Sequence, residues 1–205
     1  RYAGNAAGEI KNIDLEIKTG ECVLLCGRSG CGKTTILRLL NGLIPDYYDG
    51  TLTGEVLYDG KNISEMEMYE RARFAGSVFQ NPRTQFFNVD TDSEIAFGME
   101  NMSIPREQML QRMEAVTEKL RLQALRGRSI FGLSGGEKQR IAFASVYAMN
   151  PEVYLLDEPS SNLDTDSIDE LKEQLRLIRE EGKTILISEH RIYYLMELVD
   201  RIIYL

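Results

Sequence analysis

The fold of this chain is decided by the stretch Gly27-Arg28-Ser29-Gly30-Cys31-Gly32-Lys33-Thr34. It matches G-x-x-x-x-G-K-[S/T], the P-loop pattern, in which glycines let backbone N–H groups turn inward around phosphate oxygens at a helix N-terminus. The apolar run 22–26 before it predicts a buried strand, and the stretch 33–40 after it predicts a helix. The alternative is a glycine turn before an ordinary helix, which the strand and helix in register on both sides disfavour.

Each position of this loop has an expected task. We expect Lys33 to reach the β- and γ-phosphates of a nucleotide, and we expect the Thr34 hydroxyl to bind Mg²⁺. The predicted cofactors are therefore ATP and Mg²⁺. The further loop residues that we expect to contact ATP are Gly27, Ser29, Gly30, Cys31, Gly32 and Thr35.

A second apolar run, 153–156, leads directly into Asp157-Glu158-Pro159. A strand that ends in Asp places a carboxylate at the carboxyl edge of the sheet, where α/β proteins bind ligands. We expect Asp157 to hold Mg²⁺, directly or through water, and Glu158 to orient and polarise the attacking water. Without the P-loop, the same residues could merely end a strand with exposed charge.

The apolar pattern of the whole chain predicts an α/β fold, because alternating helices and short buried strands imply a mostly parallel sheet covered on both faces. We expect a P-loop NTPase core in a single domain over 1–205, with an antiparallel β lobe near the N-terminus and an inserted α-helical lobe over 92–132. The other expected elements are strands at 9–17, 74–79, 184–187 and 201–205, a hairpin within 51–63 that turns at Asp59-Gly60, and helices at 136–149 and 166–181.

Composition narrows the class of protein. The chain has 24 basic and 32 acidic residues, a formal net charge of −8, and a surface of that sign repels nucleic acid. We therefore expect no nucleic-acid partner. The longest apolar stretch, 141–149, is far shorter than the roughly 20 residues that span a bilayer. The first residue is Arg1 rather than Met, so we expect the chain to be a fragment of a longer protein.

The cysteines do not predict a metal site. Cys22, Cys26 and Cys31 form no C-x-x-C pair, and the chain has one histidine. These residues lack the ligand set of a zinc centre. We expect Cys22 and Cys26 to pack inside the fold, and an odd cysteine count without a visible signal peptide is typical of a reducing cytosol.

A Ser-Gly-Gly turn, Ser134 to Gly136, precedes another expected helix. A flexible turn with a hydroxyl group at a helix N-terminus is a second place where an anion can bind. One nucleotide rarely needs two such turns, so we interpret this one as a contact for a nucleotide that a partner holds. The alternative is a capped helix start that binds nothing.

The longer run Leu133-Ser134-Gly135-Gly136-Glu137-Lys138-Gln139-Arg140 is similar to the signature motif of the ATP-binding cassette (ABC) family. Other motifs of that family follow in its order and cover essentially the whole chain. Gln80 resembles the Q-loop glutamine, the run 161–164 resembles the D-loop, and His190 resembles the switch histidine. Tyr2, ahead of the P-loop, resembles the aromatic residue that stacks on adenine.

The resemblance implies a role for each of these residues. The turn 134–136 and Asp164 would contact ATP held by a second ABC ATPase domain. Gln80 would link the Mg²⁺ site to a membrane partner, and His190 would contact the γ-phosphate and the attacking water. From the residues alone, Gln80 could be a loop amide and His190 could be a surface residue. Stacking of Tyr2 on adenine would contribute about 1–3 kcal/mol to binding. The predicted catalytic residues are Lys33, Gln80, Glu158 and His190, the predicted Mg²⁺ ligands are Thr34, Gln80 and Asp157, and the predicted ATP contacts outside the P-loop are Tyr2, Ser134, Gly135, Gly136 and Asp164.

A further similarity indicates a subclass. The stretches 80–87 and 94–101, and Ser-Glu-His-Arg at 188–191, look like the ATPases of energy-coupling factor (ECF) transporters, in which two ATPase domains drive uptake of vitamins or metal ions through a shared membrane component. The resemblance implies a peripheral place at the cytoplasmic face of the cell membrane. It also implies two kinds of partner: transmembrane transporter subunits, and a second ABC ATPase domain in a homodimer, a heterodimer or the same polypeptide. Phe86 and Phe87 could line a groove for a partner helix or belong to the core of the helical lobe.

Two other functions have to be weighed. A soluble ABC ATPase of chromosome maintenance or DNA repair would carry a long coiled coil between the P-loop and the signature, where this chain has only the helical lobe. A non-catalytic regulatory half-site would not need the four residues Lys33, Asp157, Glu158 and His190. The transported substrate is chosen by residues of other chains, and this sequence does not identify it.

Overall fold

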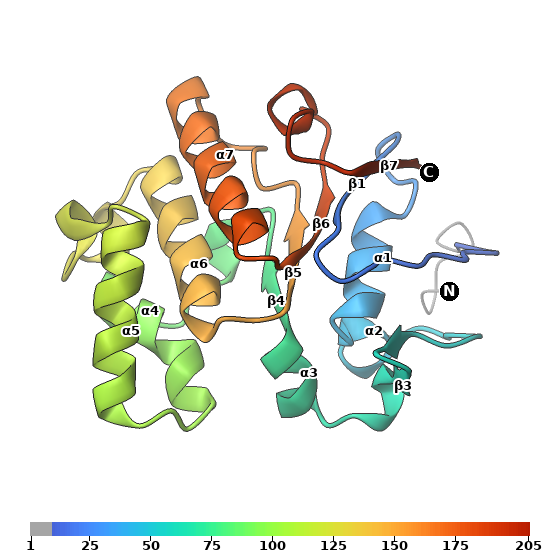
Figure 1. The fold of residues 1–205 in the computed structure, drawn as a ribbon, viewed down its shortest axis with the longest axis horizontal. Helices are drawn as coiled ribbons and strands as arrows, with labels where there is room; N and C mark the ends of the chain where they lie inside the picture. Colours follow the sequence, from blue (N-terminus) through green and yellow to red (C-terminus); the bar gives the residue numbers. More distant parts are fainter. Residues whose placement is uncertain (1–9) are drawn as a thin grey trace.

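A five-stranded parallel sheet forms the centre of the molecule (Figure 1). The structure is a computed structural model, and it describes residues 10–205. The strands lie in the order β4-β5-β6-β1-β7, and each neighbouring pair is parallel. Their carboxyl ends therefore meet at one edge, as the sequence predicts. The bounds are β1 Cys22–Cys26, β4 Ala75–Val78, β5 Val153–Asp157, β6 Thr184–Ser188 and β7 Arg201–Tyr204.

A small antiparallel sheet lies apart from the main one. Its strands, β2 (Leu57–Tyr58) and β3 (Lys61–Asn62), are joined at Asp59-Gly60, as expected. Asp59 and Gly60 both have positive φ angles, 49° and 78°, which is the backbone conformation of a tight hairpin turn. This pair of strands is the antiparallel part of the predicted fold.

The strand expected over 9–17 is not formed in the part of it that the structure describes, and α3 (Met68–Phe74) takes Phe74, which was expected to begin the strand at 74–79. Residues 10–18 have no regular secondary structure. Ile10, Leu15 and Ile17 nevertheless pack against the buried cluster around α1. The alternation therefore marks a segment with one apolar side, and alternation alone does not supply a neighbouring strand for the backbone to pair with.

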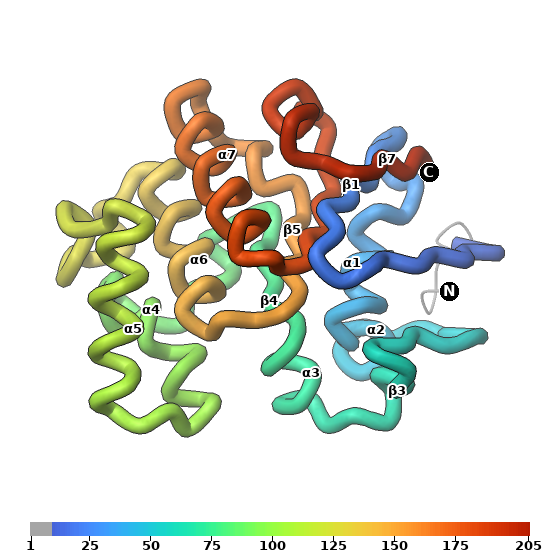
Figure 2. Tube along the Cα trace, viewed as in Figure 1, coloured from blue at the N-terminus to red at the C-terminus, as the bar shows by residue number. Residues whose placement is uncertain are grey.

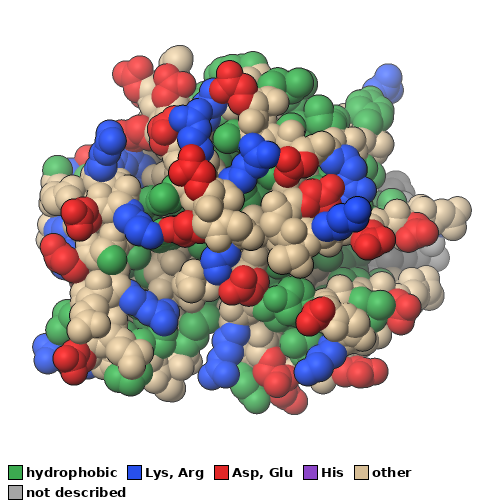
Figure 3. All heavy atoms as spheres, viewed as in Figure 1, with side chains coloured by type: hydrophobic (Ala, Val, Ile, Leu, Met, Phe, Trp, Pro, Cys, Tyr) green, Lys and Arg blue, Asp and Glu red, His purple; other side chains and the backbone are tan. Residues whose placement is uncertain are grey.

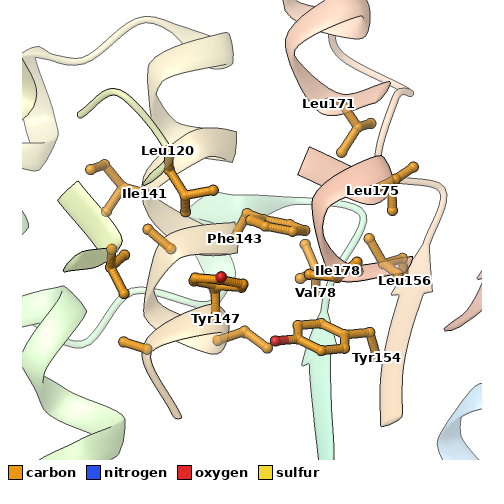
Figure 4. Packing of buried hydrophobic residues seen from close by; sticks show 14 of the residues in the cluster. Val78, Leu120, Ile141, Phe143, Tyr147, Tyr154, Leu156, Leu171, Leu175 and Ile178 are labelled. Atoms are coloured by element: carbon orange, nitrogen blue, oxygen red, sulfur yellow. The ribbon is translucent and has the colours of Figure 1, made fainter. Parts of the chain in front are cut away.

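Helices cover both faces of the sheet, and the side chains of β5 alternate between them. Leu155 packs with Ile36 and Leu37 of α1 on one face. Tyr154 and Leu156 point to the other face, where Figure 4 shows them beside residues of α6 and α7. Because successive side chains of a strand point to opposite faces, α1 and α6 lie on opposite faces of the sheet. The bounds of these helices are α1 Lys33–Leu40, α6 Gly135–Met149 and α7 Thr165–Glu180.

The region expected as a helical lobe contains α4 (Thr91–Asn101) and α5 (Arg106–Lys119), which lie side by side with α6 in Figures 1 and 2. Met99 of α4 and Met113 of α5 belong to the same buried cluster as Leu156 of the sheet. These two methionines are thus core residues. Because the cluster is continuous, the lobe is packed onto the sheet, and its division from the core at 92 and 132 stays a prediction.

Short elements complete the described part of the chain. Within residues 10–205, no helix has both the length and the apolar character needed to cross a membrane. On the face drawn in Figure 3, basic and acidic side chains are interspersed. The remaining helices are α2 Leu43–Asp46 and α3 Met68–Phe74, and the 3₁₀ turns are Ile63–Glu65, Pro82–Thr84, Gln123–Leu125, Ile130–Gly132 and Tyr193–Leu195.

Candidate functional site

The carboxyl edge of the sheet gathers four of the predicted motifs. The P-loop follows β1, the segment with Gln80 follows β4, Glu158 follows β5, and His190 follows β6. Because β4, β5, β6 and β1 are consecutive neighbours, these segments lie next to one another although they span more than half of the chain. Hydrogen bonds link their side chains into one group.

The P-loop ends in an open helix N-terminus. Gly32, the N-cap of α1, has a φ of 109°, and no side chain caps this helix. Gly27 and Gly30 also have positive φ angles, 148° and 80°, so the loop depends on the backbone freedom of glycine. The uncapped N–H groups at this end of α1 are the groups that a phosphate would bind.

Lys33 lies folded over the loop and is only 4% exposed. Its Nζ donates to the carbonyl oxygens of Gly27, at 3.2 Å, and Arg28, at 3.3 Å. The same Nζ lies 3.4 Å from His190 Nε2 and 4.0 Å from Cys31 Sγ. A buried ammonium group bound to backbone carbonyls is placed to exchange them for phosphate oxygens.

Thr34 and Asp157 meet at the position expected for Mg²⁺. The Thr34 hydroxyl donates to Asp157 Oδ1 at 3.0 Å. Ser188, at the end of β6, donates to the same oxygen at 2.6 Å. Hydroxyl and carboxylate oxygens are the ligands that Mg²⁺ prefers, and one or two protein ligands suffice when phosphates and waters supply the others. The residues present therefore fit this ion, and Ser188 is a partner of Asp157 that no motif in the sequence predicts.

Glu158 lies between two of the predicted catalytic residues. His190 Nε2 lies 3.0 Å from its Oε1, and Gln80 Nε2 donates to its Oε2 at 2.8 Å. Glu158 has a φ of 45°, in the left-handed region, and its N–H donates to the Ser188 carbonyl at 2.9 Å. Such a backbone costs on the order of 1 kcal/mol. Gln80 binds Glu158 here, so its role as a Mg²⁺ ligand stays a prediction.

The Ser-Gly-Gly turn is part of a complete capping box. Ser134 Oγ accepts from the Glu137 N–H at 3.2 Å, and Glu137 Oε2 accepts from the Ser134 N–H at 2.7 Å. The turn also lies against the start of α7, since a Cβ on Gly136 would come within 2.2 Å of Ser167 Oγ. It opens α6, which covers the face of the sheet opposite to α1, so the turn and the P-loop begin helices on opposite faces of the sheet (Figure 1).

The remaining predicted residues have varied surroundings. Asp164 caps α7, with its carboxylate accepting from the Ser167 N–H at 2.9 Å, so a contact with ATP stays a prediction. Thr35 follows Thr34 in the first turn of α1. Tyr2 lies outside the described residues. Cys22 is buried as expected, and this burial raises the pKa of its thiol to about 12.

Comparisons with known proteins decide the family. A model of the family described as "ABC transporter" matches residues 10–161. The chain belongs to that family. It is an ABC ATPase domain, with the mixed α/β fold of its solved neighbours. The role of each individual site residue stays a prediction.

Relatives of this domain are longer than the chain. A putative ABC transporter ATP-binding protein of Treponema denticola is 57% identical over 204 residues, which are 100% of this chain and 42% of the relative. The putative HMP/thiamine import ATP-binding protein YkoD of Bacillus subtilis is 44% identical over 184 residues, covering 89% of this chain and 34% of that protein. The chain thus spans between 33% and 42% of the length of such curated relatives.

Solved structures give the same fold. CbiO1 of Clostridium perfringens, described as part of the ABC transporter complex cbiONQ, superposes with a TM-score of 0.83 at 30% identity, covering 95% of this chain and 77% of that one. The ATP-binding cassette MJ0796, in a dimeric post-hydrolysis state with ADP and Pi, has a TM-score of 0.82 at 28% identity, covering 96% and 85%.

Proposed function

We propose that this ATPase domain powers a membrane transporter by closing, with ATP, onto a second ABC ATPase domain. The observation that carries the proposal is the separation of the two predicted ATP-binding surfaces. The P-loop opens α1 on one face of the sheet, and the turn 134–136 opens α6 on the other. One bound nucleotide would not reach both within this domain, so the turn would serve the nucleotide of a partner.

The residues at the carboxyl edge suit hydrolysis of ATP. Lys33 would leave the carbonyls of Gly27 and Arg28 and neutralise the β- and γ-phosphates. Mg²⁺ bound with ATP would neutralise further phosphate charge beside Thr34 and Asp157. Glu158, held by Gln80 and His190, would accept a hydrogen bond from the attacking water and orient it toward the γ-phosphorus.

Closure and separation would then follow the state of the nucleotide. The γ-phosphate would bridge the P-loop of one domain and the turn 134–136 of the other. Its loss would remove the contact that distinguishes the closed pair from the open one. The dimeric state described for MJ0796 supports this cycle, and relatives more than twice as long as this chain have room for a second domain of its size.

We infer that the transporter is of the energy-coupling factor type and takes up a vitamin or a metal ion. The likeness to CbiO1 and to the relative named for HMP/thiamine import supports this class. Phe86 packs against the core, whereas Phe87 is 74% exposed and stacks on Phe97 at 4.8 Å between ring centroids. This aromatic surface would receive a helix of the membrane subunit at the cytoplasmic face of the membrane.

Trapping of ATP tests the closure. In the full-length protein, Glu158→Gln should bind ATP and hydrolyse it about 100-fold more slowly, because the amide keeps the shape and loses the carboxylate. ATP held between two domains should stay bound through rapid gel filtration, whether the second domain lies in the same polypeptide or another. The double variant Lys33→Ala/Glu158→Gln is the control and should retain none. Release of ATP as fast as from the wild type would count against closure.

A second experiment tests the membrane partner. Phe87→Asp should abolish co-purification of the transmembrane subunits from detergent-solubilised membranes, while the Kd for ATP stays unchanged. Tyr204→Asp is the matched control, since Tyr204 is 72% exposed but lies on β7, at the opposite edge of the sheet from β4. Equal recovery of the transmembrane subunits with both variants would mean that the aromatic surface at Phe87 does not bind them.

A further inference from the structure

Glu189, the residue before His190, is a buried carboxylate that the proposed reaction does not use. It is 1% exposed, whereas the side chain of its neighbour His190 is 44% exposed. Burial of a carboxylate is costly unless hydrogen bonds replace the lost water. The partners of Glu189 should therefore indicate what it does.

Four donors surround this carboxylate, and none of them is a lysine or an arginine side chain. Oε1 accepts from the backbone N–H groups of His190, at 2.7 Å, and Arg191, at 3.2 Å. Oε2 accepts from the backbone N–H of Ser160, at 3.2 Å, and from the Tyr194 hydroxyl, at 3.0 Å. Burial, with Glu189 beside it, raises the pKa of the Tyr194 phenol, which keeps this hydroxyl protonated as a donor. One oxygen thus holds the backbone at His190, and the other holds the turn that follows Glu158.

Arg191, on the other side of His190, makes a second link to the same turn. Its Nη1 donates to the Leu163 carbonyl at 3.0 Å. The turn is closed on itself by the Leu163 N–H, which donates to the Ser160 carbonyl at 3.2 Å. It is also bonded to Glu158, whose carbonyl accepts from Ser161 N–H at 3.1 Å. Residues on both sides of His190 are therefore bonded to the segment 160–163.

We propose that Glu189 and Arg191, here named the switch clamp, are positioning residues that hold His190 in a fixed place relative to the turn 160–163. A second ATPase domain that presses on this turn would then also set the position of His190. The inference rests on the proposed function, in which His190 contacts the γ-phosphate at a site completed by that domain.

The chemistry of the clamp requires a carboxylate at position 189. All three backbone partners are N–H groups, which can only donate. In the best orientation of Glu189→Gln, the amide oxygen keeps His190 and Arg191, and the Tyr194 hydroxyl turns to accept from the new NH₂ group. The N–H of Ser160 cannot turn and loses its acceptor. This substitution therefore removes the link through Glu189 with almost no change in volume and leaves the Arg191 link in place.

The test compares kcat, KM and the Kd for ATP in the full-length protein. Glu189→Gln should lower kcat about tenfold while the Kd for ATP changes less than about twofold. Arg191→Met should lower kcat about threefold, because it removes the second link alone. Tyr194→Phe is the matched control: it removes a donor to the same carboxylate but leaves the three backbone links, and kcat should stay within about twofold of the wild type.

Combination with His190→Ala separates positioning from general destabilisation. If the clamp acts through His190, Glu189→Gln should cause no additional loss of single-turnover rate in the His190→Ala background. Losses that multiply, or a Glu189→Gln protein with wild-type kcat, would overturn the clamp and leave the proposed function standing. A His190→Ala protein with wild-type kcat would overturn both. If circular dichroism shows that Glu189→Gln does not fold, Arg191→Met replaces it in the same comparison. Arg191→Met should then cause no additional loss of single-turnover rate in the His190→Ala background.

Discussion

Two helix N-termini in this domain have similar glycine-rich sequences and different structures. The end of α1 has Gly32 as its N-cap, no side-chain cap and no acidic residue in its first turn. The end of α6 has Ser134 as its N-cap, a complete capping box and Glu137 in its first turn. Lys33 adds a positive charge at the first end, whereas Glu137, paired with Arg128, adds a negative charge at the second.

The difference indicates that the two ends would bind a phosphate under different conditions. At α1 the N–H groups and the ammonium of Lys33 act together on an anion. At α6 the capping box already uses the N–H groups of Ser134 and Glu137, which leaves those of Gly135 and Gly136 outside it. The second end would therefore hold an anion weakly by itself, and it would become useful once another domain brings a nucleotide whose charge is largely neutralised.

The largest effect is expected from Lys33→Ala at the open end. Loss of the ammonium should weaken ATP binding on the order of 100-fold and abolish turnover, since the N–H groups alone would face the phosphate charge. Isothermal titration measures the Kd, and circular dichroism checks the fold. Lys33→Met, which keeps most of the side-chain length, is the control and should lose binding as well. Wild-type affinity in either folded variant would refute the site.

Ser134→Arg tests whether the capped end serves another domain. A bulky cation there should block closure, so turnover should fall at least about 30-fold while the Kd for MgATP stays within about twofold. Gln123→Arg, which adds the same charge at an exposed residue of the 3₁₀ turn 123–125, is the control and should keep normal turnover. A large loss of affinity in Ser134→Arg would mean that the turn contacts the nucleotide of its own domain.

Ser134→Ala measures the capping box itself. Loss of the hydroxyl acceptor should lower the free energy of unfolding by about 1 kcal/mol, whereas Ser134→Gly should cost only a few tenths. Urea unfolding of the two variants gives the difference. Equal stability of the wild type and Ser134→Ala would show that the box contributes nothing and that the serine is free to bind a ligand.

The smallest effect is a pH dependence of the same cap. The Ser134 N–H, followed by the Arg128 guanidinium, lowers the pKa of Glu137 below its ordinary value of 4.5. A lowered pKa in the folded state means that the stabilisation is complete above the ordinary pKa and is lost as the pH falls through the lowered one. The stability advantage of the wild type over Glu137→Gln should therefore shrink between about pH 5 and pH 3. If this stability advantage stays constant with pH, the charge of Glu137 does not contribute to the cap.

Most of the fold follows from local patterns, and the exception is instructive. The helix expected at 166–181 is present as α7, with Leu171 and Leu175 on its buried face and Asp164 as its N-cap. The segment with Ile13 and Leu15 alternates equally well and forms no strand. A helix closes its own hydrogen bonds, whereas a strand depends on a neighbour that its own sequence does not contain.

The candidate site divides in the same way. Motif spacing predicts the roles of Lys33 and Asp157, because their chemistry is tied to a turn and to a strand end. Ser188 and Glu189 were missed although they stand beside His190 in the sequence. Their partners, Asp157 and Ser160, come from another strand end, so only the order of strands in the sheet brings them together. An acidic residue directly before the histidine was the available signal.

The contact of Gly136 with Ser167 has a kinetic consequence. The turn 134–136 and the start of α7 lie more than two dozen residues apart in the sequence, yet the space between them would not hold one added methyl group. A surface assembled before its partner arrives loses little conformational entropy on association. A second domain would therefore bind both segments in one step, because the two segments are already in contact before it arrives.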